Sequence, residues 1–167
     1  MTVFEILRTE YLNRYPNKTV PFLRAILLYY RDPNFRVVVL IRCCVSKKRL
    51  YLKKWCCKKL QIKYNVLLSR NTKIGKNFRP EHYLGLVIGS GVIIGDNCVT
   101  YQQVTLGQKN DLYPQIGDNV TIYAGAKIIG DIKIGDNAII GANAVVLKDI
   151  PNGCTAVGVP ARVINNE

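Results

Sequence analysis

Aliphatic residues recur at intervals of six positions over most of the stretch from Ile88 to Val146, and most of them are followed by glycine, two polar residues and a small or apolar residue. The apolar fifth residue of one repeat and the aliphatic first residue of the next are two positions apart. In an extended chain they therefore face the same way. A fixed short period of this kind is typical of a solenoid. The pattern reads IGDNC at 94–98, IGDNV at 116–120, IGDNA at 134–138 and IGANA at 140–144, with an earlier copy, IGKNF, at 74–78.

Each repeat predicts a short strand followed by a turn. Glycine and asparagine, which separate the apolar pairs, are the residues that tolerate a positive φ, so we expect the chain to turn there. Stacked coils then bury a common interior of Ile, Val and Ala that a single coil could not bury. A β-sandwich is disfavoured because its turn signals come every 8–12 residues or so. The sequence therefore predicts a mainly β fold, a parallel β-helix.

Helices are expected before the repeats. Apolar residues at helical spacing in 2–15 predict a helix that ends before Pro16, and a second should begin near Pro21. Asp32-Pro33 is a good N-cap followed by a first-turn proline, which predicts a third helix through about Val45. The basic segment 47–64 predicts another helix. We expect an N-terminal helical subdomain over 1–65 and a β-helix domain over 66–167.

The positive charge of the chain is concentrated in one region. Of a net charge of +13 over 167 residues, residues 31–79 contribute fifteen Lys and Arg against one acid, Asp32. This region could be a solvated face that balances an acidic ligand. It could equally be a membrane-surface patch, since Trp55 and Tyr51 among lysines suit an anionic leaflet. Nucleic acid is disfavoured because no recognition motif accompanies the charge.

The six cysteines predict neither a metal site nor an oxidising compartment. They include no C-x-x-C pair, and neighbouring residues on a helix point about 100° apart, so the vicinal pairs make poor metal clamps. The N-terminus lacks a basic start with an apolar run, and no stretch reaches the ~20 apolar residues of a membrane helix. We expect a cytoplasmic protein with reduced thiols, in contact at most with the inner face of the membrane.

Two breaks in the six-residue register mark candidate functional positions, because insertions emerge from a solenoid as surface loops. Counting from Ile74 arrives two residues short of Ile88, so a slip lies within 80–85. A second break places four extra residues in 108–115. His82, the only histidine, lies in the first break. A lone histidine is more often structural than catalytic, but this position favours a catalytic role.

Three segments resemble the hexapeptide-repeat acyltransferases, in particular the serine acetyltransferase-like branch and the nearby capsule and exopolysaccharide O-acetyltransferases. They read HYLGLVIGSGVIIGDNCVTYQQVTLG at 82–107, YPQIGDNVTIYAGAKIIGDIKIGDNAIIGANAVVLKDIP at 113–151 and GVPARVI at 158–164. The resemblance covers about residues 64–165. It implies a left-handed β-helix, a homotrimer, and acetyl-CoA bound as co-substrate in the grooves between subunits, with no metal.

The resemblance also implies roles for individual residues. His82 aligns with the catalytic base, which takes the proton of an acceptor hydroxyl as the oxygen attacks the thioester carbonyl, and imidazole titrates near neutrality as such a base requires. The developing oxyanion would be stabilised by the Gly107–Gln108 peptide. Acceptor contacts would come from Asp111 and Tyr113. The remaining implied acetyl-CoA contacts, which could equally be tight coil packing or solvated charges, are Ala124, Gly125, Ala142, Lys148 and Arg162.

Two departures from the serine acetyltransferase pattern bear on the acceptor. Leu67 stands fifteen residues before His82, where those enzymes have an aspartate, and Tyr113 replaces their second active-site histidine. We therefore expect acetylation of a hydroxyl on a sugar or polysaccharide precursor, with serine as the alternative acceptor. A metal-dependent β-helix enzyme is rejected because one histidine per chain is too few. A scaffold without enzymatic activity is the other alternative, which a His82 variant would test.

Overall fold

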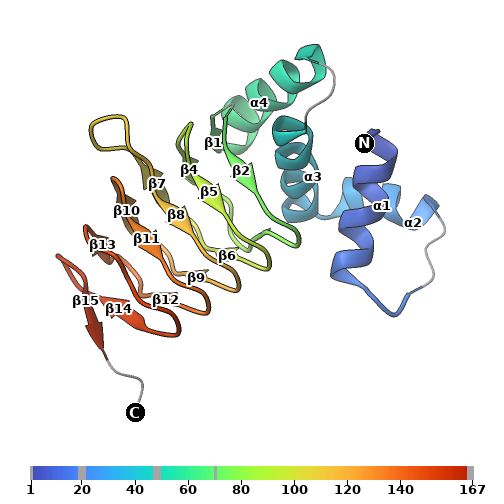
Figure 1. Cartoon of the computed structure of the whole chain (residues 1–167). Helices are drawn as coiled ribbons and strands as arrows, with labels where there is room; N and C mark the ends of the chain where they lie inside the picture. The colour runs from blue at the N-terminus through green and yellow to red at the C-terminus, as the bar shows by residue number, and fades with distance from the viewer. Residues whose placement is uncertain (1, 19–21, 47–49, 70, 165–167) are drawn as a thin grey trace.

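A computed structural model describes residues 2–18, 22–46, 50–69 and 71–164. Within these ranges four helices precede a β-helix, as Figure 1 shows. The predicted start of the second helix near Pro21 and residues 47–49 of the predicted basic helix lie outside the described residues. The helices are α1 (Val3–Arg14), α2 (Phe22–Arg31), α3 (Pro33–Val45) and α4 (Leu50–Tyr64).

Local sequence explains where two of these helices begin. Thr2 and Glu5 form a capping box at α1, in which the Thr2 side chain accepts from the Glu5 N–H and the Glu5 carboxylate accepts from the Thr2 N–H. Asp32 caps α3: its Oδ1 accepts from the backbone N–H of Asn34 at 2.8 Å and of Phe35 at 3.2 Å. Pro33 occupies the first turn, where it loses no hydrogen bond. The predicted start of the third helix is confirmed.

The β-helix consists of three sheets that the chain visits in turn, and their strands pair in parallel except for the last one. The first sheet holds β1 (Leu67–Leu68), β4 (Val87–Ile88), β7 (Thr105–Gly107), β10 (Lys127–Ile129) and β13 (Val145–Val146). The second holds β2 (Lys73–Ile74), β5 (Ile93–Ile94), β8 (Gln115–Ile116) and β11 (Lys133–Ile134). The third holds β3 (Arg79–Pro80), β6 (Val99–Thr100), β9 (Thr121–Ile122), β12 (Ile139–Ile140), β14 (Thr155–Val157) and β15 (Arg162–Ile164).

The strand pairs stack the aliphatic positions of successive coils. Ile88 lies over Leu106, Leu106 over Ile128, and Ile128 over Val146, and all four side chains are buried. Full burial of each such side chain stabilises the fold by about 1.5–3 kcal/mol. The predicted parallel β-helix with an N-terminal helical region is confirmed.

Three edges separate the sheets, and they have different roles. The asparagine edge joins the second sheet to the third and carries the Gly-x-Asn turns. The histidine edge joins the third sheet to the first and contains residues 81–86, 101–104, 123–126 and 141–144. The loop edge joins the first sheet to the second and contains residues 108–114.

At the asparagine edge, glycine and asparagine serve different purposes. The asparagines adopt positive φ, as predicted, at Asn77, Asn97, Asn119 and Asn137. The glycines two positions earlier do not, which corrects the expectation that both residues supply the turn in this way. A Cβ on Gly95 would lie only 2.6 Å from the Gly117 carbonyl oxygen and would also collide with the Asp118 carboxylate. Glycine is required here because the next coil packs directly against its Cα.

Side-chain ladders run along the asparagine edge. Asp118 accepts a hydrogen bond from the Asp96 N–H at 2.7 Å, and the Asp118 N–H donates to Asp136 at 2.7 Å. In parallel, Asn97 donates to the side-chain oxygen of Asn119 at 3.1 Å. Each coil thereby holds the next through side chains as well as through the sheets.

The helices pack on the N-terminal end of the β-helix, where α4 contacts α3 and β1 (Figure 1). Arg42 of α3 joins the parts: its Nε donates to Glu10 of α1 at 2.8 Å and its Nη1 to the Ile74 carbonyl at 3.0 Å. One hydrophobic core runs from the helices into the coils, and the division into two domains at residue 65 stays a prediction. None of the helices in the described ranges has the length and apolar character needed to cross a membrane.

Candidate active site

The strand register confirms both predicted breaks. Leu67 pairs with Val87, twenty residues later, whereas Val87 pairs with Thr105, eighteen residues later. The two extra residues lie between β3 and β4. Ile93 pairs with Gln115, twenty-two residues later, so the four extra residues lie between β7 and β8. The insertions thus lie at different edges: the first at the histidine edge, the second at the loop edge.

His82 is exposed on the histidine edge. Its ring lies 6.0 Å from that of Tyr101, centroid to centroid, and Tyr101 stacks on Tyr123 at 5.1 Å with an interplanar angle of 16°. An aromatic column thus runs from the imidazole along two coils. The two tyrosines were not among the predicted site residues, although their spacing of one coil, twenty-two residues, could have indicated them.

The histidine edge also carries three of the implied acetyl-CoA residues. Ala124, Gly125 and Ala142 lie on the same edge as His82. Ala124 and Gly125 share the turn of Tyr123, at the end of the aromatic column, and Ala142 lies one coil beyond it. Gly125 has φ +74°, and a Cβ there would collide with the Asn143 side chain. The turn therefore requires glycine for its backbone conformation and for space, whether or not Gly125 also contacts a ligand. Arg162, on β15, is exposed at the far end of the third sheet.

The loop edge carries the other implied residues: Gly107, Gln108, Asp111, Tyr113 and Lys148. The inserted loop closes on itself through reciprocal backbone hydrogen bonds of 3.1 Å between Lys109 and Leu112. Asp111 is exposed at its tip with φ +60°. The Tyr113 ring packs against the preceding coil so closely that a Cβ on Gly89 would lie 3.0 Å from it. Tyr113 therefore anchors the base of the loop.

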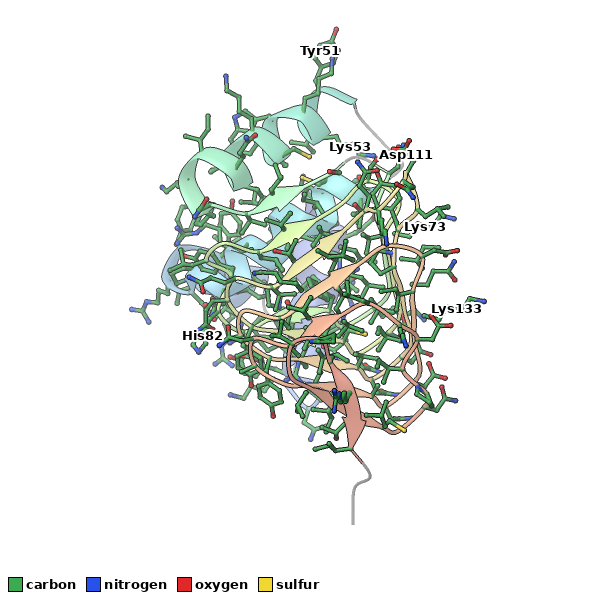
Figure 2. All side chains as sticks on the ribbon, turned by 90° about the vertical axis from the view of Figure 1, so that its left-hand side faces the viewer. Tyr51, Lys53, Lys73, His82, Asp111 and Lys133 are labelled. Carbon is green, nitrogen blue, oxygen red and sulfur yellow. The ribbon has the colours of Figure 1, made fainter. Side chains whose placement is uncertain are left out.

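One chain does not bring all the predicted site residues together. His82 and Asp111 lie on opposite sides of the molecule in Figure 2. The implied base and its neighbours occupy the histidine edge, whereas the implied oxyanion and acceptor groups occupy the loop edge. A site that uses both sets requires the loop edge of a second chain.

A charged cavity is lined in part by residues 77–81, which directly precede His82 in the sequence. It has a volume of about 250 Å³ and is bounded by α1, α3 and the first coil. Arg79 and Glu81 line it, 3.8 Å apart, and Arg14 lines it while paired with Asp32 at 2.9 Å. Arg79 and Glu81 precede the histidine by three positions and one position, but the sequence alone gave no reason to assign them a role. The cavity offers cationic and anionic groups to a small zwitterion.

Leu67, in place of the aspartate of the serine acetyltransferase pattern, begins β1 with its side chain 45% exposed. An aliphatic side chain cannot accept a hydrogen bond from an imidazole, so it leaves His82 without that means of orientation. The aromatic contact with Tyr101 is the packing that the structure provides instead.

The cysteines are arranged as packing residues. Cys98 is fully buried at the small position of its repeat, and burial raises the pKa of its thiol to about 11. Cys43 and Cys56 face each other between α3 and α4, as do Cys44 and Cys57. In the described ranges, no three His, Cys, Asp or Glu side chains gather as metal ligands.

Comparison with known proteins agrees with the repeat and with the whole architecture. The family described as bacterial transferase hexapeptide (six repeats) matches residues 113–148. Soybean serine acetyltransferase superposes with a TM-score of 0.79 at 30% identity, over 97% of this chain and 69% of that one. A structure titled as a serine acetyltransferase complex with CoA gives a TM-score of 0.78 at 31% identity, with the same coverage. The chain belongs to the serine acetyltransferase family.

Curated members of this family support the assignment over the β-helix. The serine acetyltransferase of Staphylococcus epidermidis is 50% identical over 106 residues, which are 61% of this chain and 50% of that protein. The serine acetyltransferase of Staphylococcus aureus is 48% identical over the same length. The chain thus spans about half the length of the curated relatives it matches. The resemblance to the hexapeptide-repeat proteins of the serine acetyltransferase-like branch is confirmed, whereas the proximity to capsule and exopolysaccharide O-acetyltransferases is not shown.

Proposed function

We propose that this protein is an acetyl-CoA-dependent O-acetyltransferase whose acceptor is serine. The observation that carries the proposal is the position of His82, exposed at the register slip directly after the residues that line a charged cavity, in a chain that superposes on serine acetyltransferases. The sugar acceptor favoured from the sequence receives no support from the comparisons, and the serine alternative fits them better.

The charged cavity supports serine on chemical grounds. A free amino acid presents an ammonium and a carboxylate, and Glu81 and Arg79 offer the complementary charges at one wall. A neutral sugar hydroxyl needs neither. Leu67 remains the feature that favours a sugar, because it removes one carboxylate from the family's acceptor site.

His82 would accept the proton of the acceptor hydroxyl while that oxygen forms a bond to the thioester carbonyl carbon. As the carbon–sulfur bond breaks, the same imidazole would return the proton to the departing sulfur. Acetyl-CoA supplies the activated acetyl group. The Gly107–Gln108 peptide, from the loop edge, would donate to the carbonyl oxygen as negative charge develops there.

The residues implied for acetyl-CoA fit its chemistry. Ala124, Gly125 and Ala142 carry no bulky side chains, so a long ligand could lie against this part of the histidine edge, beside the aromatic column. Lys148 and Arg162 are exposed cations suited to phosphates. Because these groups lie on different edges of one chain, we propose that the site forms between subunits of a homotrimer, as the resemblance to hexapeptide-repeat acyltransferases implies. Sedimentation equilibrium tests that assembly.

The test is release of the CoA thiol from acetyl-CoA in the presence of L-serine or of a set of sugars. His82→Ala should lower kcat with serine by about 10²–10⁴-fold, and Lys133→Ala, on the outer face of β11, should not. Glu81→Gln should raise the KM for serine at least tenfold and leave the KM for acetyl-CoA unchanged. Full turnover in His82→Ala would contradict the mechanism. Turnover with sugars alone would exclude serine and retain acetyl transfer.

A further inference from the structure

The outward face of α4 combines apolar side chains with lysines in a way that nothing in acetyl transfer requires. Tyr51 is 88% exposed, Ile62 73% and Trp55 53%, whereas Cys56, Leu60 and Tyr64 on the opposite face are buried against α3 and β1. An exposed tryptophan and tyrosine on one helix face cost the protein solubility unless a partner covers them.

The order of these residues along the helix is regular. At about 100° per residue, Tyr51, Trp55 and Ile62 fall within about 40° of one another and form one stripe, here called the α4 stripe. Lys58 and Lys54 lie on one flank of the stripe, and Lys59 and Lys63 on the other. Lys59 Nζ lies 4.4 Å from the centre of the Trp55 ring. The stripe is therefore apolar along its centre and cationic along both flanks.

No acidic side chain offsets this charge on α4, and the sequence from 33 to 80 contains none. Among the acids of the other helical segments, Glu10 and Asp32 are paired with Arg42 and Arg14, and Glu5 accepts a hydrogen bond from the Thr2 N–H at the start of α1. An anionic surface would meet four lysines without facing repulsion. Its interior would also have to accept the rings of Tyr51 and Trp55.

An apolar cavity adjoins the stripe. It has a volume of about 320 Å³, is bounded by all four helices, and is lined by Trp55 together with Leu7, Tyr29, Val39 and Leu52. Apolar surface thus continues from the stripe into the helical region. Figure 2 shows Tyr51 projecting from α4 at the end of the molecule opposite the C-terminus, well away from His82. Contact through this end leaves the histidine edge open.

We propose that the α4 stripe docks the protein on an anionic lipid bilayer. Tryptophan and tyrosine favour the boundary between headgroups and acyl chains, and flanking lysines pair with anionic headgroups. The proposal narrows the basic region 31–79 to a single helix face, because most of α3 is buried. A folded protein partner or a second copy of this chain would need shape complementarity rather than flanking lysines. Vesicle binding distinguishes the lipid surface from these two alternatives.

Trp55 is the only tryptophan of the chain, so its fluorescence reports on the stripe directly. Vesicles of mixed phosphatidylcholine and phosphatidylserine should shift its emission to shorter wavelength and carry the protein down on sedimentation. Pure phosphatidylcholine vesicles should do neither, and added salt should release the protein. Lys54→Gln/Lys58→Gln should weaken binding about 25-fold, at about fivefold for each lysine.

Tyr51→Ala/Ile62→Ala keeps the charge and the reporter but removes apolar surface, and it should weaken binding at every salt concentration. Lys133→Gln, a lysine removed from β11 far from α4, is the matched control and should bind as the parent does. The proposal is overturned by unchanged Trp55 emission with anionic vesicles, by equal binding of the Lys54/Lys58 variant, or by a blue shift that depends on protein concentration without lipid. The assay contains no acetyl-CoA or serine, so its outcome is independent of the proposed function.

Discussion

The close packing of glycine at the asparagine edge predicts a large cost for a single methyl group. Gly95→Ala would place a Cβ 2.6 Å from the Gly117 oxygen and 2.7 Å from the Gly117 carbonyl carbon. Both are backbone atoms held by the strand pairs of the next coil, so neither can rotate away. The Asp118 carboxylate, which also meets the added methyl, can rotate, but only by releasing the Asp96 N–H.

The magnitude follows from these two losses. Overpacking a well-packed site costs about 1–3 kcal/mol. Losing the hydrogen bond from the Asp96 N–H to Asp118 costs about 1 kcal/mol more. Gly95→Ala should therefore lower the free energy of unfolding by about 2–4 kcal/mol. In a protein of this size that corresponds to a fall in Tm on the order of 10 °C.

Urea unfolding followed by circular dichroism measures the effect, and two glycines provide controls. Gly107→Ala meets nothing closer than 3.7 Å and should change stability little. Gly153 has open space around it but φ +68°, so alanine there should cost only the left-handed strain of about 1–2 kcal/mol. If Gly95→Ala proves as stable as Gly107→Ala, close coil packing is not what requires glycine in the repeat.

Three further substitutions test the remaining interactions. Asp118→Asn keeps an acceptor for the Asp96 N–H and removes one of the stacked negative charges, so urea unfolding should show unchanged or slightly higher stability. Asp118→Ala removes the acceptor and should lower the free energy of unfolding by about 1 kcal/mol. Equal effects of the two substitutions would exclude a hydrogen-bond role for Asp118. Because burial raises the pKa of Cys98 to about 11, its contribution to stability is complete below the unfolded value near 9 and is lost as pH rises toward 11. Between pH ~8 and ~10.5 the free energy of unfolding of the parent should therefore fall by about 2 kcal/mol more than that of Cys98→Ala. Parallel dependences of the two unfolding free energies on pH would contradict this. Arg42→Met leaves the buried Glu10 carboxylate without its ion-pair partner and should lower the free energy of unfolding in urea by about 3–5 kcal/mol. Arg42→Met/Glu10→Met should recover most of that loss. A double variant no more stable than the single one would show that the ion pair itself stabilises the helices on the coils.

Local signals made much of this molecule predictable. The six-residue period fixes which side chains enter the coil, and the Asp32-Pro33 cap fixes the start of α3, because both act over a few neighbouring residues. Both register breaks could be counted directly, so the position of His82 at an edge was predictable too.

Contacts between coils were harder to predict. The stack of Tyr101 on Tyr123 joins residues twenty-two apart, and the collision that excludes a side chain at Gly95 comes from a neighbouring coil. A glycine selected for φ and one selected for space look the same in a sequence. The separation of the implied site residues onto two edges also follows from three-dimensional coil geometry, since Gly107 and Ala124 are close in sequence but lie at different corners.

Both ends of the β-helix are covered, which has a consequence for its assembly. At one end α4 packs over β1. At the other, β15 turns back antiparallel to β14, while the N–H and carbonyl of Val145 in β13 bond to Gly158 and Ala161. A bare parallel coil would present open strand edges on which another molecule could continue the sheets, as in a fibre. With the parallel coils covered at both ends, another coil cannot stack on them to continue the first and third sheets in parallel.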